Sequence, residues 1–287
     1  MHSYLGRLFL CVLIGLVGGL RAATVQPAQP VTVVAMQVRG TVEVTHGKST
    51  EAEAVAEGDE LGVDDIITTA AQSSVMLVVP NGTVVALKEK SRLKIALALQ
   101  SPLVGEALAA NETEPHEPAV SKTSFELAFG EMLTRVRKLN PSSTFEVQTP
   151  VSVAAVRGTV FEVSYQPGTT GEAQYRLSTA SGLVHVKPHE GKMVAVSESE
   201  QVDMAAEVGK HGVKIKHLKS SKLDRKKQEQ LQKEGSDNER NAGEFMQRWQ
   251  QRNAEARAKA AENRAAKPAS PAHVPAGKRP LKKRPSN

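Results

Sequence analysis

Cysteine is almost absent from this chain, since Cys11 is the only one among 287 residues. It lies in an apolar N-terminal run, so the rest of the sequence contains none. This excludes a disulfide framework, a cysteine nucleophile and a thiolate metal site from the body of the protein. Stability must therefore come from burial, which a body of about 180 residues can supply without crosslinks.

Aromatic residues are also scarce, at 3% of the chain against 40% for all apolar residues. The core therefore has to be built from Val, Leu, Ile and Ala. The net charge of +6 averages two unlike parts. Residues 210–287 hold 21 Lys and Arg against eight Asp and Glu, a net charge of +13, which leaves residues 1–209 at −7. A basic region of this kind attracts anionic surfaces.

Catalytic motifs are missing as well. The sequence shows no nucleophile elbow, no phosphate-binding loop and no Ser/His/Asp set in a known context. Paired carboxylates can be chosen freely from so many acids and therefore indicate nothing. We expect no enzymatic activity, no catalytic residue and no cofactor.

Two clusters could suggest a metal site, and both lack the required pattern. His185 and His189 are four residues apart beside Glu190, but the surrounding valines and proline predict a strand end instead of one helical face. A group of aspartates lacks the spacing and final glutamate of a calcium loop: Asp59, Asp64 and Asp65. We therefore expect no metal ligands.

The first 22 residues have the pattern of a secretory signal peptide. Arg7 precedes an apolar run, Leu8–Leu20, and Ala22 offers a cleavage site before Ala23. Thirteen helical residues rise about 20 Å, which is short of the roughly 30 Å hydrocarbon core. We expect a periplasmic or secreted protein, with an uncleaved anchor as the alternative.

After a linker at residues 23–30, strand patterns fill residues 31–204. Apolar and polar residues alternate through Gly40–Thr45, and Asn81-Gly82 is a strong hairpin signal. Residues 93–99 fit a strand or a helix, and the neighbouring rhythm favours a strand. Residues 100–123 are predicted to form an acidic surface loop. The sequence predicts an all-β body, either a twisted antiparallel sandwich or a solenoid-like fold.

A weak internal repeat favours the solenoid-like form. The segment Arg39–Val44 recurs as Arg157–Val163, with a glycine before an alternating stretch in both. Glycine also precedes strands without any repeat, so both explanations stay open.

Beyond residue 204 the composition becomes basic, and residues 205–267 are expected to form a partly helical extension. Phe245, Met246 and Trp249 share one face of this helix. They form either a face for a partner or a face that packs back onto the β body. Residues 268–287 are rich in Pro, Lys and Arg and are expected to be disordered.

One extended segment carries the clearest family signal. It contains Thr149, Pro150, Ala155, Val156, Arg157, Gly158 and Thr159, in the order Thr-Pro, then Ala-Val-Arg-Gly-Thr. Earlier segments add to it: Glu57–Leu61, Asp64–Thr69, Val75–Leu87, Phe129–Met132 and Phe145–Gln148. Together they resemble FecR-type domains, extracytoplasmic modules named after a bacterial ferric-citrate regulator. The resemblance covers roughly residues 31–200.

The resemblance implies a non-enzymatic envelope module, a scaffold or sensor that binds a protein partner or an anionic polymer or lipid surface. The alternative is a regulator of an extracytoplasmic-function sigma factor. That role would require a cytoplasmic arm, whereas this chain starts with a leader pattern. For Arg157-Gly158-Thr159 we favour a packing role, since Gly suits a bend and Thr suits a strand.

Overall fold

The computed structural model describes residues 27–102, 117, 119–210 and 212–266. The predicted leader and the residue 268–287 tail lie outside these ranges, as does most of the predicted acidic loop. The described elements follow in chain order: β1 (Gln29–Pro30), β2 (Val33–Arg39), β3 (Val42–Thr45), β4 (Ala52–Ala54), β5 (Glu60–Leu61), β6 (Ile66–Thr69), β7 (Ser74–Val78), β8 (Val84–Leu87), β9 (Ser91–Gln100), β10 (Ser121–Arg135), β11 (Thr144–Gln148), β12 (Ser152–Val156), β13 (Val160–Pro167), β14 (Glu172–Ser181), β15 (Leu183–Pro188), β16 (Val194–Ser197), β17 (Glu200–Gly209), β18 (Gly212–Lys222) and α1 (Arg225–Ala266).

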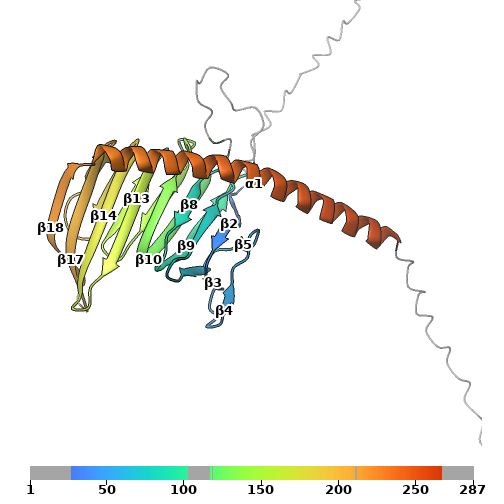
Figure 1. Cartoon of the computed structure of the whole chain (residues 1–287), viewed down its shortest axis with the longest axis horizontal. Helices are drawn as coiled ribbons and strands as arrows, with labels where there is room; N and C mark the ends of the chain where they lie inside the picture. Colours follow the sequence, from blue (N-terminus) through green and yellow to red (C-terminus); the bar gives the residue numbers. More distant parts are fainter. Residues whose placement is uncertain (1–26, 103–116, 118, 211, 267–287) are drawn as a thin grey trace, which may run out of the picture.

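The strands form two open sheets that lie face to face. Sheet A has the order β4-β3-β6-β9-β10-β11-β12-β15-β16, with β1 against β9. Sheet B has the order β5-β2-β7-β8-β10-β13-β14-β17-β18. All described pairs are antiparallel except β10–β11. The outer strands of each sheet do not pair with each other in the described residues, so the predicted all-β fold is confirmed as open sheets (Figure 1).

Strand β10 belongs to both sheets. Its first part, to Phe129, pairs with β9 and β11 in sheet A, and its last part, from Gly130, pairs with β8 and β13 in sheet B. Gly130 has a φ of +105° at this change, and a Cβ there would lie 2.4 Å from Cα of Ser91. One strand therefore ties the two sheets together through a position that only glycine fits.

The space between the sheets is filled by aliphatic side chains, as the shortage of aromatics requires. One continuous cluster runs through both sheets and includes Ile67, Leu93 and Val163, each fully buried. Phe125 and Phe145 add a tilted ring pair with centroids 5.9 Å apart. Burial of these apolar side chains stabilises the body of the protein, whose sequence contains no cysteine for disulfide bonds.

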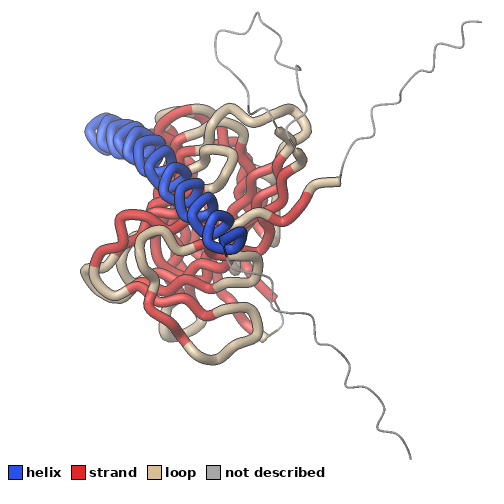
Figure 2. Tube along the Cα trace, turned by 90° about the vertical axis from the view of Figure 1, so that its right-hand side faces the viewer, coloured by secondary structure: helices blue, strands red, loops and turns tan. Residues whose placement is uncertain are grey.

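Helix α1 lies on the outer face of sheet B and crosses its strands (Figures 1 and 2). It begins after Asp224, whose side chain accepts hydrogen bonds from the backbone N–H groups of Lys226 and Lys227. Its 42 residues span about 63 Å. The residues that face the sheet alternate three and four apart: Gln228, Leu231, Gly235, Asn238, Ala242, Phe245 and Trp249.

This cover explains why parts of sheet B lack alternation. All four residues of β8 are buried: Val85 and Leu87 face the core between the sheets, whereas Val84 and Ala86 lie in clusters with side chains of α1. Strand β15 lies in sheet A, away from the one described helix, and alternates between exposed and buried residues. The apolar run at Val84–Leu87 therefore reflects a strand that is covered on both faces.

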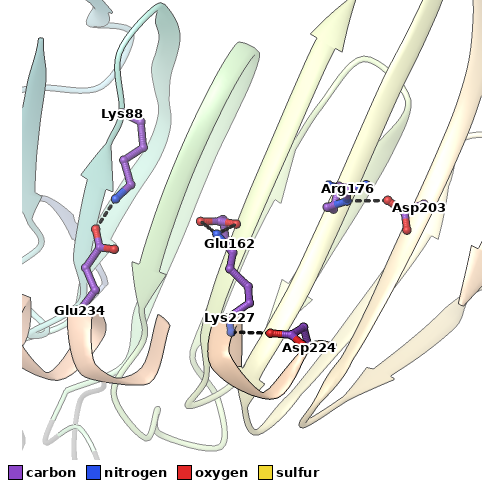
Figure 3. Close-up of polar contacts among 7 residues, drawn as sticks. All are labelled: Lys88, Glu162, Arg176, Asp203, Asp224, Lys227 and Glu234. Carbon is purple, nitrogen blue, oxygen red and sulfur yellow. Dashed lines mark hydrogen bonds and ion pairs between the residues drawn. The ribbon is translucent and has the colours of Figure 1, made fainter. Parts of the chain in front are cut away.

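Ion pairs join α1 to the same face (Figure 3). Lys88 pairs with Glu234, and Nζ of Lys227 lies 2.8 Å from a carboxylate oxygen of the buried Glu162. Glu131 lies beside Glu162 on this face. Burial, and then the nearby Glu162 carboxylate, raise the pKa of Glu131 above its ordinary value of 4.5.

The strands continue past residue 204, where we expected the body to end. β17 and β18 complete sheet B, because Val213, Ile215 and Leu218 alternate with basic residues and pack against the core. The lysines that gave this segment its basic composition lie on an edge strand, where they discourage pairing with other chains. The predicted loop at 100–123 is also shorter, since β9 reaches Gln100 and β10 starts at Ser121.

We predict that Glu131→Gln stabilises the protein at about pH 8 but not at about pH 4. A raised folded-state pKa means that the folded protein favours the protonated form of Glu131. The stability that this form contributes is fully present below the ordinary pKa of 4.5, and it is lost as pH rises through the folded-state pKa. The neutral amide avoids that loss. Thermal melts across this pH range test it, with the exposed Glu53→Gln as the control. A stability change that is the same at both ends of the range would contradict the prediction.

Candidate binding groove at the Arg-Gly-Thr turn

The signature starts with a tight turn between β11 and β12. The buried Thr149 accepts a hydrogen bond at Oγ1 from the N–H of Ser152, 3.1 Å away, and its own N–H donates to the Ser152 carbonyl at 2.8 Å. Pro150 is exposed at the tip of this turn. Ala155 and Val156 follow on β12, between β11 and β15, with Val156 turned into the core. These four residues build the strand pair that leads to the Arg-Gly-Thr turn.

At Gly158 the chain passes from sheet A to sheet B. Its φ is +81°, and a Cβ would lie 3.2 Å from Cα of Lys138. Gly182, at the return from β14 to β15, lies opposite, since a Cβ there would be 2.7 Å from the Gly158 carbonyl oxygen. Thr159 exchanges backbone hydrogen bonds of 3.1 and 2.8 Å with Val136. The two crossings between the sheets, at Gly158 and Gly182, therefore lie close to each other and to the end of β10.

A groove of about 530 Å³ opens at this meeting point. The side chain of Arg157 is exposed there, and its guanidinium donates a 2.7 Å hydrogen bond to the Pro141 carbonyl. The groove is lined by Arg135, Val136, Arg137, Lys138, Arg157, Gly158, Thr159, Ser181, Gly182 and, from α1, Glu239.

Four cationic side chains share this groove with one carboxylate. Glu239 lies 2.7 Å from Arg135 and 3.7 Å from Arg137, whereas Lys138 and Arg157 make no ion pair with any described residue. The lining therefore carries an excess of three positive charges. Guanidinium groups bind carboxylate or phosphate through paired N–H donors, so this arrangement suits an anionic group.

Sequence reasoning singled out Arg157 as part of the family signature but favoured a packing role for it, and it missed the other cationic residues of the groove. Arg135, Arg137 and Lys138 form a short basic run directly after the alternating part of β10, which was a usable signal. Glu239 could not be found in this way, because 104 residues separate it from Arg135. Only the path of α1 across sheet B brings the two together.

The family model described as FecR protein matches residues 65–185. The predicted FecR-type resemblance is thereby confirmed over residues 65–185. The match runs from just before β6 into β15 and includes every lining residue of the groove except Glu239. The comparison with curated proteins found no match.

Two solved structures of a candidate anti-sigma factor from Parabacteroides distasonis ATCC 8503, at 2.50 and 1.65 Å resolution, are similar to this chain at 18% identity. Their TM-scores are 0.39 and 0.37, and each alignment covers 55% of this chain and 60% of that protein. In the described residues, no helix combines the length and apolar composition that a membrane span requires.

The three residues proposed as a partner face lie outside the FecR match, on α1. Phe245 is buried against Val34 and Val84 of sheet B, and Met246 and Trp249 pack against the same cluster. These residues therefore face the β body in this structure.

The histidines and aspartates considered as metal ligands are spread over the FecR domain and its flanks. His185 is exposed on β15, and Nε2 of His189 lies 3.2 Å from the Thr149 carbonyl. The aspartates contact other groups: Asp59 with the Ala56 N–H, Asp64 with Lys94, and Asp65 with His46. Among the described residues, no group of three or more His, Cys, Asp or Glu side chains could hold a metal.

We predict that Gly158→Val destabilises the FecR domain by about 1–3 kcal/mol. Its positive φ disfavours a side chain, and the new Cβ would press on Lys138. Gly191→Val is the matched control, because Gly191 has a φ of +110° but no atom within 4 Å of its Cβ position. Denaturant unfolding measures both. An unchanged midpoint for Gly158→Val would show that the turn is not a packing element.

Proposed function

We propose that this FecR-domain protein is a non-enzymatic envelope module, a scaffold or sensor, that binds an anionic group of a protein or polymer partner in the basic groove. The observation that carries the proposal is the excess of positive charge at the Arg-Gly-Thr turn. Lys138 and Arg157 lie there without a carboxylate partner among the described residues. Cationic side chains without a carboxylate partner keep N–H donors available for an anionic ligand.

The backbone around the groove supports recognition by a rigid surface. Backbone hydrogen bonds fix Thr159 to Val136, and Gly158 and Gly182 approach each other closely. A site that is already formed loses little conformational entropy when a ligand binds.

The side chains of the groove also favour binding over catalysis. Arginine keeps its proton at any physiological pH, and the single carboxylate in the lining is held by two arginines. The groove therefore offers electrostatic attraction and hydrogen-bond donors, and no free general base.

The basic region at residues 210–287 adds attraction of longer range. Its net charge of +13 acts over roughly 8 Å at physiological salt. An exported chain meets anionic lipid and wall polymer first, so we propose that this region brings the FecR domain to such surfaces.

The second candidate is a regulator in an extracytoplasmic-function sigma factor pathway. The match of residues 65–185 to the FecR family favours it, because that family is named after a bacterial ferric-citrate regulator. Crosslinking and purification of the full chain from envelope extracts separates the two candidates. Recovery of an anti-sigma or sigma partner would favour the regulator, and recovery of an envelope protein or polymer would favour the scaffold.

We predict that Lys138→Gln combined with Arg157→Gln weakens binding of poly-L-glutamate by about tenfold or more, since hydrogen bonds to charged groups contribute about 1.5–3 kcal/mol. Arg176→Gln is the matched control, because Arg176 is exposed on β14 and pairs with Asp203 at 2.6 Å, outside the groove. Isothermal titration at low salt measures the affinities. Equal losses in the variant and the control would show that the groove is not the binding site.

We further predict that binding of the full chain to anionic vesicles falls as salt rises, because screening shortens the reach of the basic region. A variant that stops after Ala266 keeps all described elements but loses six Lys and Arg. It should bind more weakly, with a shallower dependence on salt. Unchanged binding in a sedimentation assay would show that residues 267–287 do not contribute.

A further inference from the structure

Helix α1 places one carboxylate of the chain inside the basic groove. Glu239 comes from outside the matched FecR residues and lies 2.7 Å from Nε of Arg135 and 3.7 Å from Nε of Arg137. Among the residues that the structure describes, it is the only acidic side chain in the lining. Glu239 therefore occupies the place that an external carboxylate would take in the same groove.

The middle of α1 is weak as a helix. Gly235, Ser236, Asp237 and Asn238 follow one another there, and each has a low intrinsic preference for helix. Packing explains the glycine, because a Cβ at Gly235 would lie 2.9 Å from Cγ1 of Val160. The segment just before Glu239 is therefore kept helical by its contact with sheet B more than by its own residues.

The contact between α1 and sheet B is also narrow. Open spaces of about 470 and 310 Å³ lie along the helix, one beside Lys88 and Asn238 and one beside Arg137 and Met246. From Gln250 to Lys259 every side chain except Asn253 is exposed, and this end extends past the sheets (Figure 1). A single stripe of small and polar residues with a few large apolar ones holds the helix in place.

We propose that Glu239 is an internal competitor for the groove, and that an acidic peptide segment of a partner displaces it from Arg135 and Arg137 and loosens α1 from sheet B. The inference rests on the proposed function of the groove. We choose a peptide because Glu239, which occupies the groove here, is part of an acidic peptide segment. That segment also contains Glu234, Asp237 and Glu244. Partner binding and docking of α1 then oppose each other, because both require a carboxylate to pair with Arg135 and Arg137.

The chain contains its own reporter for this displacement. Trp249 is the only tryptophan, and its indole N–H donates to the Gly58 carbonyl at 3.2 Å, at the end of the contact stripe. When α1 leaves sheet B, this side chain passes from a half-buried to a hydrated setting. Its emission should then move to longer wavelength.

The test uses the full chain and a short poly-L-glutamate, with inorganic phosphate as a second probe. Glu239→Gln should bind poly-L-glutamate about tenfold more tightly than wild type, since the internal carboxylate is gone. Glu244→Gln, an exposed position on the same helix outside the groove, should bind as wild type does. In wild type, saturation with the peptide should shift the Trp249 emission to longer wavelength.

A second variant separates competition from general loosening of the helix. Glu234→Gln removes a different α1 contact, the one to Lys88 outside the groove. Its gain in affinity should be smaller than that of Glu239→Gln, and equal gains would overturn direct competition. An equal Trp249 shift with phosphate alone would overturn the assignment to a peptide.

The outcomes also distinguish this inference from the function on which it rests. If Lys138→Gln with Arg157→Gln weakens binding while Glu239→Gln binds as wild type does, the groove stands as the site and the competitor role is wrong. If wild type and Glu239→Gln both fail to bind poly-L-glutamate, the proposed function fails along with the inference.

Discussion

The cover that α1 provides for sheet B is the contact on which the other features depend. With few aromatics and no crosslinks, the protein gains its stability from thin aliphatic layers, and sheet B buries such residues on both faces. Removing the helix would expose Val34, Val84 and Leu133 to water. The same contact carries Glu239 to the end of β10, so the stability of the fold and the electrostatics of the groove share one element.

The groove itself is a product of chain crossings. β10 ends beside the turn at Gly158 and the turn at Gly182, which are the points where neighbouring segments change sheet. The cationic side chains of the groove come from two separate stretches of sequence, residues 135–138 and Arg157. Short backbone contacts at Gly158 and Thr159 hold these two stretches together. The FecR match covers these stretches and stops before the helix, so the groove combines lining residues from the matched segment with Glu239 from outside it.

Local signals explain what could be predicted from the sequence. The hairpin at Asn81-Gly82, the strand at residues 93–99 and the turn at Gly158 each follow from short-range rules and are present in the structure. Strand β18 was not predicted, because its many lysines suggested a basic extension. Its apolar residues, Val213, Ile215 and Leu218, nevertheless alternate with polar ones as in a strand. The position of α1 was left open because its sheet-facing stripe includes glycine, asparagine and glutamine, which give little apolar periodicity. Contacts across 100 residues or more leave no trace in a local pattern.

The position of α1 in the chain has a consequence for how the protein is made. Synthesis runs from the N-terminus, so the strands of sheet B emerge before the helix that shields their outer face. Until residues 225–249 arrive, that face is a row of aliphatic side chains open to water and to other chains. Before α1 docks, the outer face of sheet B is therefore an exposed apolar patch of the kind that associates with other chains.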